Sequence, residues 1–288
     1  MSSNTLLPIK DVLLQSWRNV KGVKGKIWLG YLMTLISGGI IMSLFFLLSL
    51  LVPSLPTPST LFFLPSSGIA LTLQQVILIS IISIVNYLII APLVAWMMMT
   101  SIKRTRQEPI GYDTLFNYFN CHDWPRISIA LIISILPFLL LNFIHLIMLF
   151  HVKVSTTQIL LPTVRALSSI IFIVAFIILQ LMMMYTVPSL IEKNLSPWQA
   201  ICQSYQLSKG YRLRIFIIYF VQTLILGLVY GGPLFILVSL TMNLPFPPVL
   251  ILSLIFIFFG LIWIYPWLWM TYGAIYHRLT QSTRTNIE

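Results

Sequence analysis

Residues 187–216 read VPSLIEKNLSPWQAICQSYQLSKGYRLRIF, and this stretch decides how the chain is organised. A membrane-length apolar run ends at its start, and another begins within its last residues. The tetrapeptide SPWQ at 196–199 has the pattern of a helix start, with a serine N-cap, a proline at the first helical position and a glutamine that can complete a capping box. Lys209 and Gly210 have the pattern of a helix end. The stretch therefore predicts a short helix between two membrane spans.

One face of this predicted helix is aromatic. Trp198, Ile201 and Tyr205 recur at helical spacing. Arg212 and Arg214 follow the terminal glycine and precede the apolar run. We expect the helix to lie in the cytoplasmic headgroup layer with its aromatic face toward the lipid. The alternative is that the helix only packs on the transmembrane bundle.

The same pattern occurs near the N-terminus of the chain. Residues 14–27 (LQSWRNVKGVKGKI) align without a gap with residues 202–215 (CQSYQLSKGYRLRI). The alignment pairs six cations: Lys21 with Lys209, Lys24 with Arg212, and Lys26 with Arg214. Self-similarity of this kind predicts one structural unit that is used more than once. We expect it to recur within a single integral membrane domain that covers residues 1–288.

A second self-similarity lies where three apolar runs end. Residues 97–100 read MMMT, residues 182–186 read MMMYT, and residues 267–272 form a looser counterpart, WLWMTY. This echo supports the repeated unit.

Composition sets the class of the protein. The chain is 58% hydrophobic and 8% charged, and no soluble domain of 288 residues hides so much apolar surface. The sequence therefore predicts an all-α, multi-pass membrane protein. The two cysteines, Cys121 and Cys202, fall in segments that we place in the cytoplasm, so a disulfide framework is not expected.

The apolar runs predict six transmembrane helices, arranged as three hairpins. They cover residues 27–52, 71–101, 127–150, 162–187, 215–240 and 249–274. A cytoplasmic amphipathic segment precedes each hairpin, at residues 5–20, 112–126 and 196–210. In the first segment, Leu6, Ile9, Leu13, Trp17 and Val20 share the expected apolar face.

The charges orient the spans. An even number of spans puts both termini on one side, and 15 of the 17 Lys and Arg residues fall on that side. Only Lys153 and Arg165 fall on the other. The positive-inside rule then predicts cytoplasmic N- and C-termini. The net charge of +11 is thus a charge of the cytoplasmic face, and we do not expect nucleic-acid binding.

A basic face attracts anionic headgroups by about 1 kcal/mol for each well-placed Lys or Arg. The residues that we expect to contact anionic lipid are the repeated cations Lys21, Lys24, Lys26, Lys209, Arg212 and Arg214. The alternative is that these charges only orient the spans.

The sequence offers little chemistry. No Asp or Glu lies inside a predicted span, and His122-Asp123 is the one adjacent His–carboxylate pair, on a loop. The histidines and cysteines show no metal-ligand spacing, and no nucleotide-binding or hydrolase motif is present. We therefore expect no catalytic, metal or cofactor-binding residues and no enzyme activity.

Four neutral polar residues fall within the predicted spans: Asn86, Asn142, Gln180 and Gln222. Hydrogen bonds between helices account for such residues in most membrane proteins. The alternative is a polar cavity or substrate path, and the chain would then be a small transporter or lipid translocase.

A family resemblance follows from the motif P-x-L-I-E-x-x-L-S-P-W-x-A-x-x-x-S-x-x-L-x-K-G at Pro188–Gly210, which leads directly into a span. The pattern resembles the YciC-like bacterial inner-membrane proteins and relatives of the membrane domain of glycerophosphodiester phosphodiesterase. These 288 residues hold no counterpart of the soluble phosphodiesterase barrel, so its activity is not implied. The resemblance implies a bacterial inner-membrane protein with a role in envelope or lipid homeostasis. It indicates neither a protein partner nor an oligomeric state.

Overall fold

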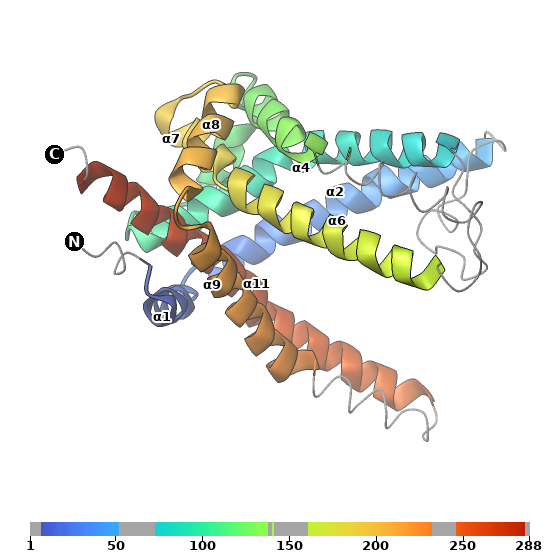
Figure 1. Cartoon of the computed structure of the whole chain (residues 1–288). Helices are drawn as coiled ribbons and strands as arrows, with labels where there is room; N and C mark the ends of the chain where they lie inside the picture. Colours follow the sequence, from blue (N-terminus) through green and yellow to red (C-terminus); the bar gives the residue numbers. More distant parts are fainter. Residues whose placement is uncertain (1–6, 52–72, 138–139, 141–160, 232–245, 286–288) are drawn as a thin grey trace. The chain divides into compact units, whose positions relative to one another are not determined.

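The computed structural model of the chain consists of helices and their connections in the part that it describes (Figure 1). It describes all residues except 1–6, 52–72, 138–139, 141–160, 232–245 and 286–288. No strand occurs among the described residues, and the predicted all-α class is confirmed.

The elements follow one another along the chain with short connections. In order they are α1 (Ile9–Asn19), α2 (Lys24–Leu51), α4 (Leu73–Thr105), the 3₁₀ helix η1 (Asp113–Phe119), α6 (Leu161–Met183), α7 (Thr186–Lys193), α8 (Pro197–Ser208), α9 (Arg212–Leu226), the π-helical turn η2 (Gly227–Gly231) and α11 (Phe246–Thr285). Residues 123–137 are also helical.

The helices form two compact units, which we describe separately. Unit 1 comprises Met1–Tyr31, Val94–Asn117 and Gln206–Glu288, and unit 2 comprises Leu32–Leu93 and Tyr118–Tyr205. Unit 1 holds 13 of the 17 Lys and Arg residues of the chain, so the cationic charge is concentrated in it.

Three described stretches are long and apolar enough to cross a membrane: Lys24–Leu47, Ile84–Thr105 and Ser169–Lys193. Each exceeds the roughly 20 residues that a bilayer requires. They coincide with the first, second and fourth predicted spans, and the chain is a membrane protein by the length and composition of these helices. The third and fifth predicted spans extend into residues outside the described part.

Two helix boundaries differ from the prediction. The fourth predicted span is one helix to 187, but the structure breaks it after Met183, and α7 begins at Thr186. Pro188 lies in α7 and has no N–H to donate to the carbonyl of Met184, which favours a break at this point. The sixth predicted span ends at 274, whereas α11 runs to Thr285 and, at 40 residues, is about 60 Å long.

Prolines inside α4 and α11 each leave a backbone carbonyl without its helical donor, and a tryptophan replaces that donor. Pro266 cannot bond to the carbonyl of Ile262, and Trp28 Nε1 at the start of α2 donates to it at 3.1 Å. Within unit 2, Pro92 leaves the carbonyl of Leu88 free in the same way. Trp124 Nε1 donates to this carbonyl at 2.8 Å, and Ser128 Oγ lies 3.4 Å from it.

Glycines allow the helices of unit 1 to approach closely. A Cβ placed on Gly273 of α11 would lie 2.5 Å from the backbone oxygen of Ser101 in α4. A Cβ on Gly30 of α2 would lie 2.8 Å from the Met97 side chain. Close packing at Gly273 therefore brings α11 onto the backbone of α4 at the end where α1 is bound.

Candidate lipid-contact surface

The two halves of the sequence repeat have the same backbone structure. α1 ends at Asn19, Gly22 has a φ of +87°, and α2 begins at Lys24. The corresponding α8 ends at Ser208, Gly210 has a φ of +85°, and α9 begins at Arg212. A positive φ at these turns favours glycine, which is why the Lys-Gly pair recurs.

The predicted start of α8 is confirmed in its hydrogen bonds. Gln199 N donates to Ser196 Oγ at 3.4 Å, and Ser196 N donates to Gln199 Oε1 at 3.2 Å, which completes a capping box. Pro197 occupies the first helical position.

Each of these two surface helices buries one face through small or polar residues. The fully buried positions of α1 are Val12, Ser16 and Val20, and the aligned positions of α8 are Ala200, Ser204 and Ser208. The predicted apolar face of α1 is therefore wrong in part, because Ser16 lies at its centre and the Trp17 ring is 46% exposed. Serine fits there because its hydroxyl is hydrogen-bonded, and a hydropathy pattern does not register that partner.

The buried serine of α1 binds α11 within unit 1. Trp267 Nε1 donates to Ser16 Oγ at 2.9 Å, and the hydroxyls of Thr271 and Ser16 lie 3.0 Å apart. α1 packs along this part of α11 (Figure 1). Arg278 Nη2 also donates to Gln15 Oε1 at 2.9 Å, farther along the same helix.

The buried serine of α8 binds the break between α6 and α7 within unit 2. Ser204 Oγ donates to the carbonyl of Met182 at 2.8 Å and accepts from the N–H of Tyr185 at 3.1 Å. The hydroxyl thus satisfies backbone groups that the helix break has freed.

The same contact occurs a third time at η1. Trp96 Nε1 of α4 donates to Thr114 Oγ1 of η1 at 3.0 Å. Trp96, Met182 and Trp267 each stand four residues before a threonine of the echoed motifs at 97–100, 182–186 and 267–271. Three surface segments therefore bind the ends of three apolar helices at equivalent positions. The second amphipathic segment is nevertheless a short 3₁₀ helix, not an α-helix.

The structure divides the six predicted lipid-contact cations by their surroundings. Lys24 Nζ lies 4.1 Å from the ring centroid of Trp263, and Lys26 Nζ donates to the carbonyl of Ile110 and lies 5.1 Å from the ring of Tyr112. Both lysines are half-buried and connect elements of unit 1. Their positions explain structural roles that the sequence did not predict.

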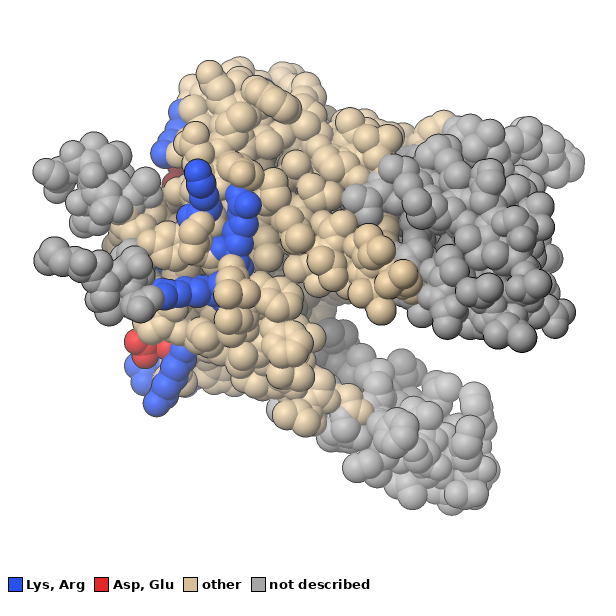
Figure 2. All heavy atoms as spheres, viewed as in Figure 1, with Lys and Arg blue, Asp and Glu red and all other residues tan. Residues whose placement is uncertain are grey.

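The four remaining cations are more open. Lys21 and Lys209 are exposed, whereas Arg212 and Arg214 are half-buried. Arg212 Nε lies 3.4 Å from Ser208 Oγ. On the face shown in Figure 2, Lys and Arg side chains gather over α1 and the beginning of α9, and uncharged residues cover the shafts of the helices.

Arg104 is a residue of this surface that sequence reasoning used only as a stop signal. Its Nη2 donates to the carbonyl of Lys21 at 2.8 Å, and its Nε donates to the carbonyl of Asn19 at 3.4 Å. These carbonyls lie at the C-terminal end of α1, where a cation is favoured by the helix dipole. Arg104 thereby fixes the turn that presents Lys21.

The neutral polar residues of the predicted spans have different surroundings. Gln222 of α9 is fully buried, and its Nε2 donates to Thr271 Oγ1 of α11 at 3.0 Å. Gln180 is exposed and Asn86 is half-buried. Asn142 lies outside the described residues. Gln222 thus makes the kind of interhelical hydrogen bond that is common in membrane proteins.

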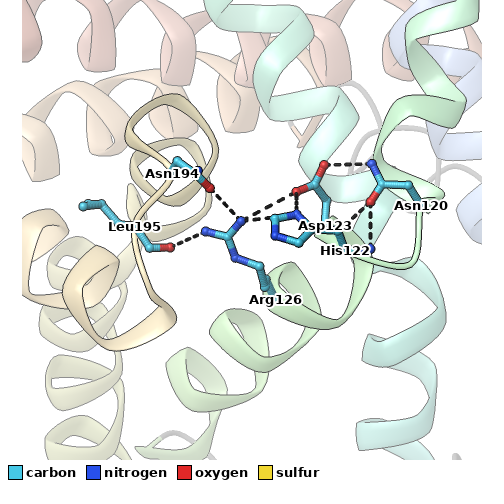
Figure 3. Close-up of polar contacts among 6 residues, drawn as sticks. All are labelled: Asn120, His122, Asp123, Arg126, Asn194 and Leu195. Atoms are coloured by element: carbon cyan, nitrogen blue, oxygen red, sulfur yellow. Dashed lines mark hydrogen bonds and ion pairs between the residues drawn. The ribbon is translucent and has the colours of Figure 1, made fainter.

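A separate polar cluster in unit 2 surrounds the predicted His–carboxylate pair (Figure 3). His122 Nδ1 and Asp123 Oδ1 are 3.1 Å apart, and Asn120 Nδ2 donates to Asp123 Oδ2 at 2.8 Å. The hydrogen bond from Asn120 is the main reason that the pKa of Asp123 lies below its usual value. Burial, with Asp123 and Glu192 nearby, raises the pKa of Tyr118 to about 12.

Arg126 joins this cluster to the end of α7. Its Nη1 donates to Asn194 Oδ1 at 2.7 Å, and its Nη2 donates to the carbonyl of Leu195 at 2.8 Å. Asn194 ends α7 in the left-handed conformation, with a φ of 50°. The cluster therefore fixes the connection that leads into α8, because its arginine is bonded to that connection.

No group of three or more His, Cys, Asp or Glu residues that could hold a metal ion occurs among the described residues. Comparison of the chain with protein-family models, with curated proteins and with solved structures found no match.

Proposed function

We propose that this chain is a non-enzymatic multi-pass protein of the bacterial inner membrane whose cytoplasmic basic surface binds anionic lipids. The observation that carries the proposal is the repeated Lys-Gly turn. It exposes one lysine, Lys21 or Lys209, a few residues before an apolar helix begins. A cation at that position lies where the headgroups of a bilayer lie.

The proposed topology has six spans as three hairpins, with both termini in the cytoplasm. The three candidate spans and the concentration of cations in unit 1 support it. Cysteines placed at Lys103 and Lys209 should react with an impermeant thiol reagent from the same side of the membrane. Reaction from opposite sides would refute this topology.

The lipid proposal is tested on the full chain in nanodiscs that contain phosphatidylglycerol and phosphatidylcholine. The variant Lys21→Gln/Lys209→Gln removes the exposed pair, and replacement of all six repeated cations removes the whole set. At about 1 kcal/mol for each lysine, the pair should contribute a factor of about 30 in the preference for the anionic lipid. The measurement is the ratio of the two lipids retained by the protein in native mass spectrometry.

Lys153→Gln is the matched control, because this lysine is predicted to lie on the opposite side of the membrane. It should leave the ratio unchanged, and high salt should lower the ratio for the unmodified chain. An unchanged ratio for the six-cation variant would refute lipid binding by this surface.

A further inference from the structure

α1 and α8 each present an outward face that corresponds residue for residue. The exposed residues on this face of α1 are Lys10, Leu14, Trp17 and, just beyond the helix, Lys21. The aligned residues of α8 are Trp198, Cys202, Tyr205 and Lys209, and all four are exposed. The spacing of four, three and four residues places each set on one side of a helix. We call these two sets the outward stripes.

The outward stripes lie opposite the faces that bind the protein. Ser16 and Ser204 are fully buried, whereas the Trp198 ring is 66% exposed and the Tyr205 ring 40% exposed. Each helix is therefore already held on its inner side, and its aromatic residues are not needed for that attachment. Large aromatic rings on an outer face require another explanation than packing of the fold.

The depth of the stripes follows from the chain. Lys21 is three residues before Lys24, where a candidate span begins, and Lys209 is three residues before Arg212, where α9 begins. The ends of both stripes thus lie within a few residues of an apolar helix. At that level, Trp and Tyr rings enter the headgroup layer and Lys ammonium groups reach the phosphates.

We infer that the outward stripes of α1 and α8 are two equivalent membrane-surface contacts, in which the rings of Trp17, Trp198 and Tyr205 are immersed in the headgroup layer and Lys21 and Lys209 bind lipid phosphates. The partner is a surface of anionic glycerophospholipids. Charge complementarity supports this choice, because each stripe carries lysine and no acidic residue. The inference rests on the proposed function and specifies which groups make the contact.

The chain contains its own probe and its own control. Cys202 lies in the middle of the α8 stripe, and Cys121 is exposed beside the polar cluster of unit 2. In the variant Cys121→Ser, a nitroxide on Cys202 reports the environment of the stripe. In Cys202→Ser, the same label on Cys121 reports a site that we expect to lie in water.

The experiment measures the accessibility of each label to oxygen and to a water-soluble nickel chelate, by electron paramagnetic resonance in nanodiscs with phosphatidylglycerol. The label at Cys202 should be more accessible to oxygen than to the chelate, and the label at Cys121 should show the reverse. Adding Lys209→Gln to the first variant should shift the Cys202 label toward water. Equal chelate accessibility at both sites would overturn the inference.

The outcomes separate this inference from the proposed function. If the unmodified chain retains phosphatidylglycerol preferentially but the Cys202 label lies in water, lipid binding stands and the stripe assignment is overturned. If the Cys202 label is immersed but no anionic lipid is preferred, the aromatic contact stands, and both the assignment of the lysines to phosphate and the proposed function fail.

Discussion

The pairing of Trp28 with the carbonyl that Pro266 leaves free gives a sharp prediction. Replacing Trp28 with Phe keeps a ring but removes the donor to the Ile262 carbonyl, now 3.1 Å away. A buried acceptor without a donor costs about 1–3 kcal/mol. Hydrogen bonds between membrane helices average about 0.6 kcal/mol, with a maximum of about 1.7. We expect Trp28→Phe to lower the free energy of unfolding by about 1–2 kcal/mol.

Pro266→Ala distinguishes this donor from simple packing of the ring. The substituted alanine would supply the backbone N–H that the carbonyl lacks, so Trp28→Phe should cost less in that background. The difference between the two costs is the coupling energy, which we expect to be about 1 kcal/mol. The assay is equilibrium unfolding of the full chain in mixed detergent micelles, for the four proteins of the cycle.

The second pair supplies the control. Trp124→Phe and Pro92→Ala should couple in the same way at the Leu88 carbonyl, but less strongly, because Ser128 Oγ lies 3.4 Å from that carbonyl. The crossed combination of Trp28→Phe with Pro92→Ala should be additive, since the two changes concern different carbonyls. Equal coupling in matched and crossed pairs would refute the explanation by proline-freed carbonyls.

Three further changes test the contacts that hold the surface segments. Ser204→Ala leaves the Tyr185 N–H without its acceptor, so we expect a loss of about 1–3 kcal/mol in detergent unfolding, whereas Ser204→Thr should retain part of the stability. Gly273→Ala places a Cβ against the backbone of α4 and should lower the melting temperature, and a rise would contradict the close approach. Because the pKa of Asp123 is lowered, its contribution to stability is complete above the usual carboxyl pKa of about 4 and is lost as pH falls through the lowered value. A fluorophore on Cys121 should report that transition, and Asn120→Ala should move it to higher pH.

Local signals in the sequence predicted local structure well. The capping box of Ser196 and Gln199 and the positive φ of Gly210 depend on residues within one helix turn, so the pattern alone locates them. The first, second and fourth apolar runs likewise predicted helices that agree with α2, α4 and α6, because hydropathy over about 20 residues is also local.

Contacts between distant segments were not predictable in this way. Lys24 and Lys26 were expected to face lipid, but they lie against Trp263 and Tyr112, which are far away in the sequence. The break before Tyr185 depends on Ser204, a residue of a later helix. One overlooked signal was present, since Trp96 and Trp267 stand at equivalent positions of the echoed motifs and both donate to surface segments.

The two faces of the surface helices allow attachment and lipid contact to be separated. Their inner faces bond to groups at the ends of apolar helices, through Ser16 and Ser204, and so decide where the helices lie. Their outer faces take no part in those bonds, so replacing Trp198 or Lys209 should leave the fold intact. A bilayer contact built in this way is rigid, because each stripe is held by hydrogen bonds on the side away from the lipid. The protein would therefore present its cations to the membrane at fixed positions, which a disordered basic segment does not do.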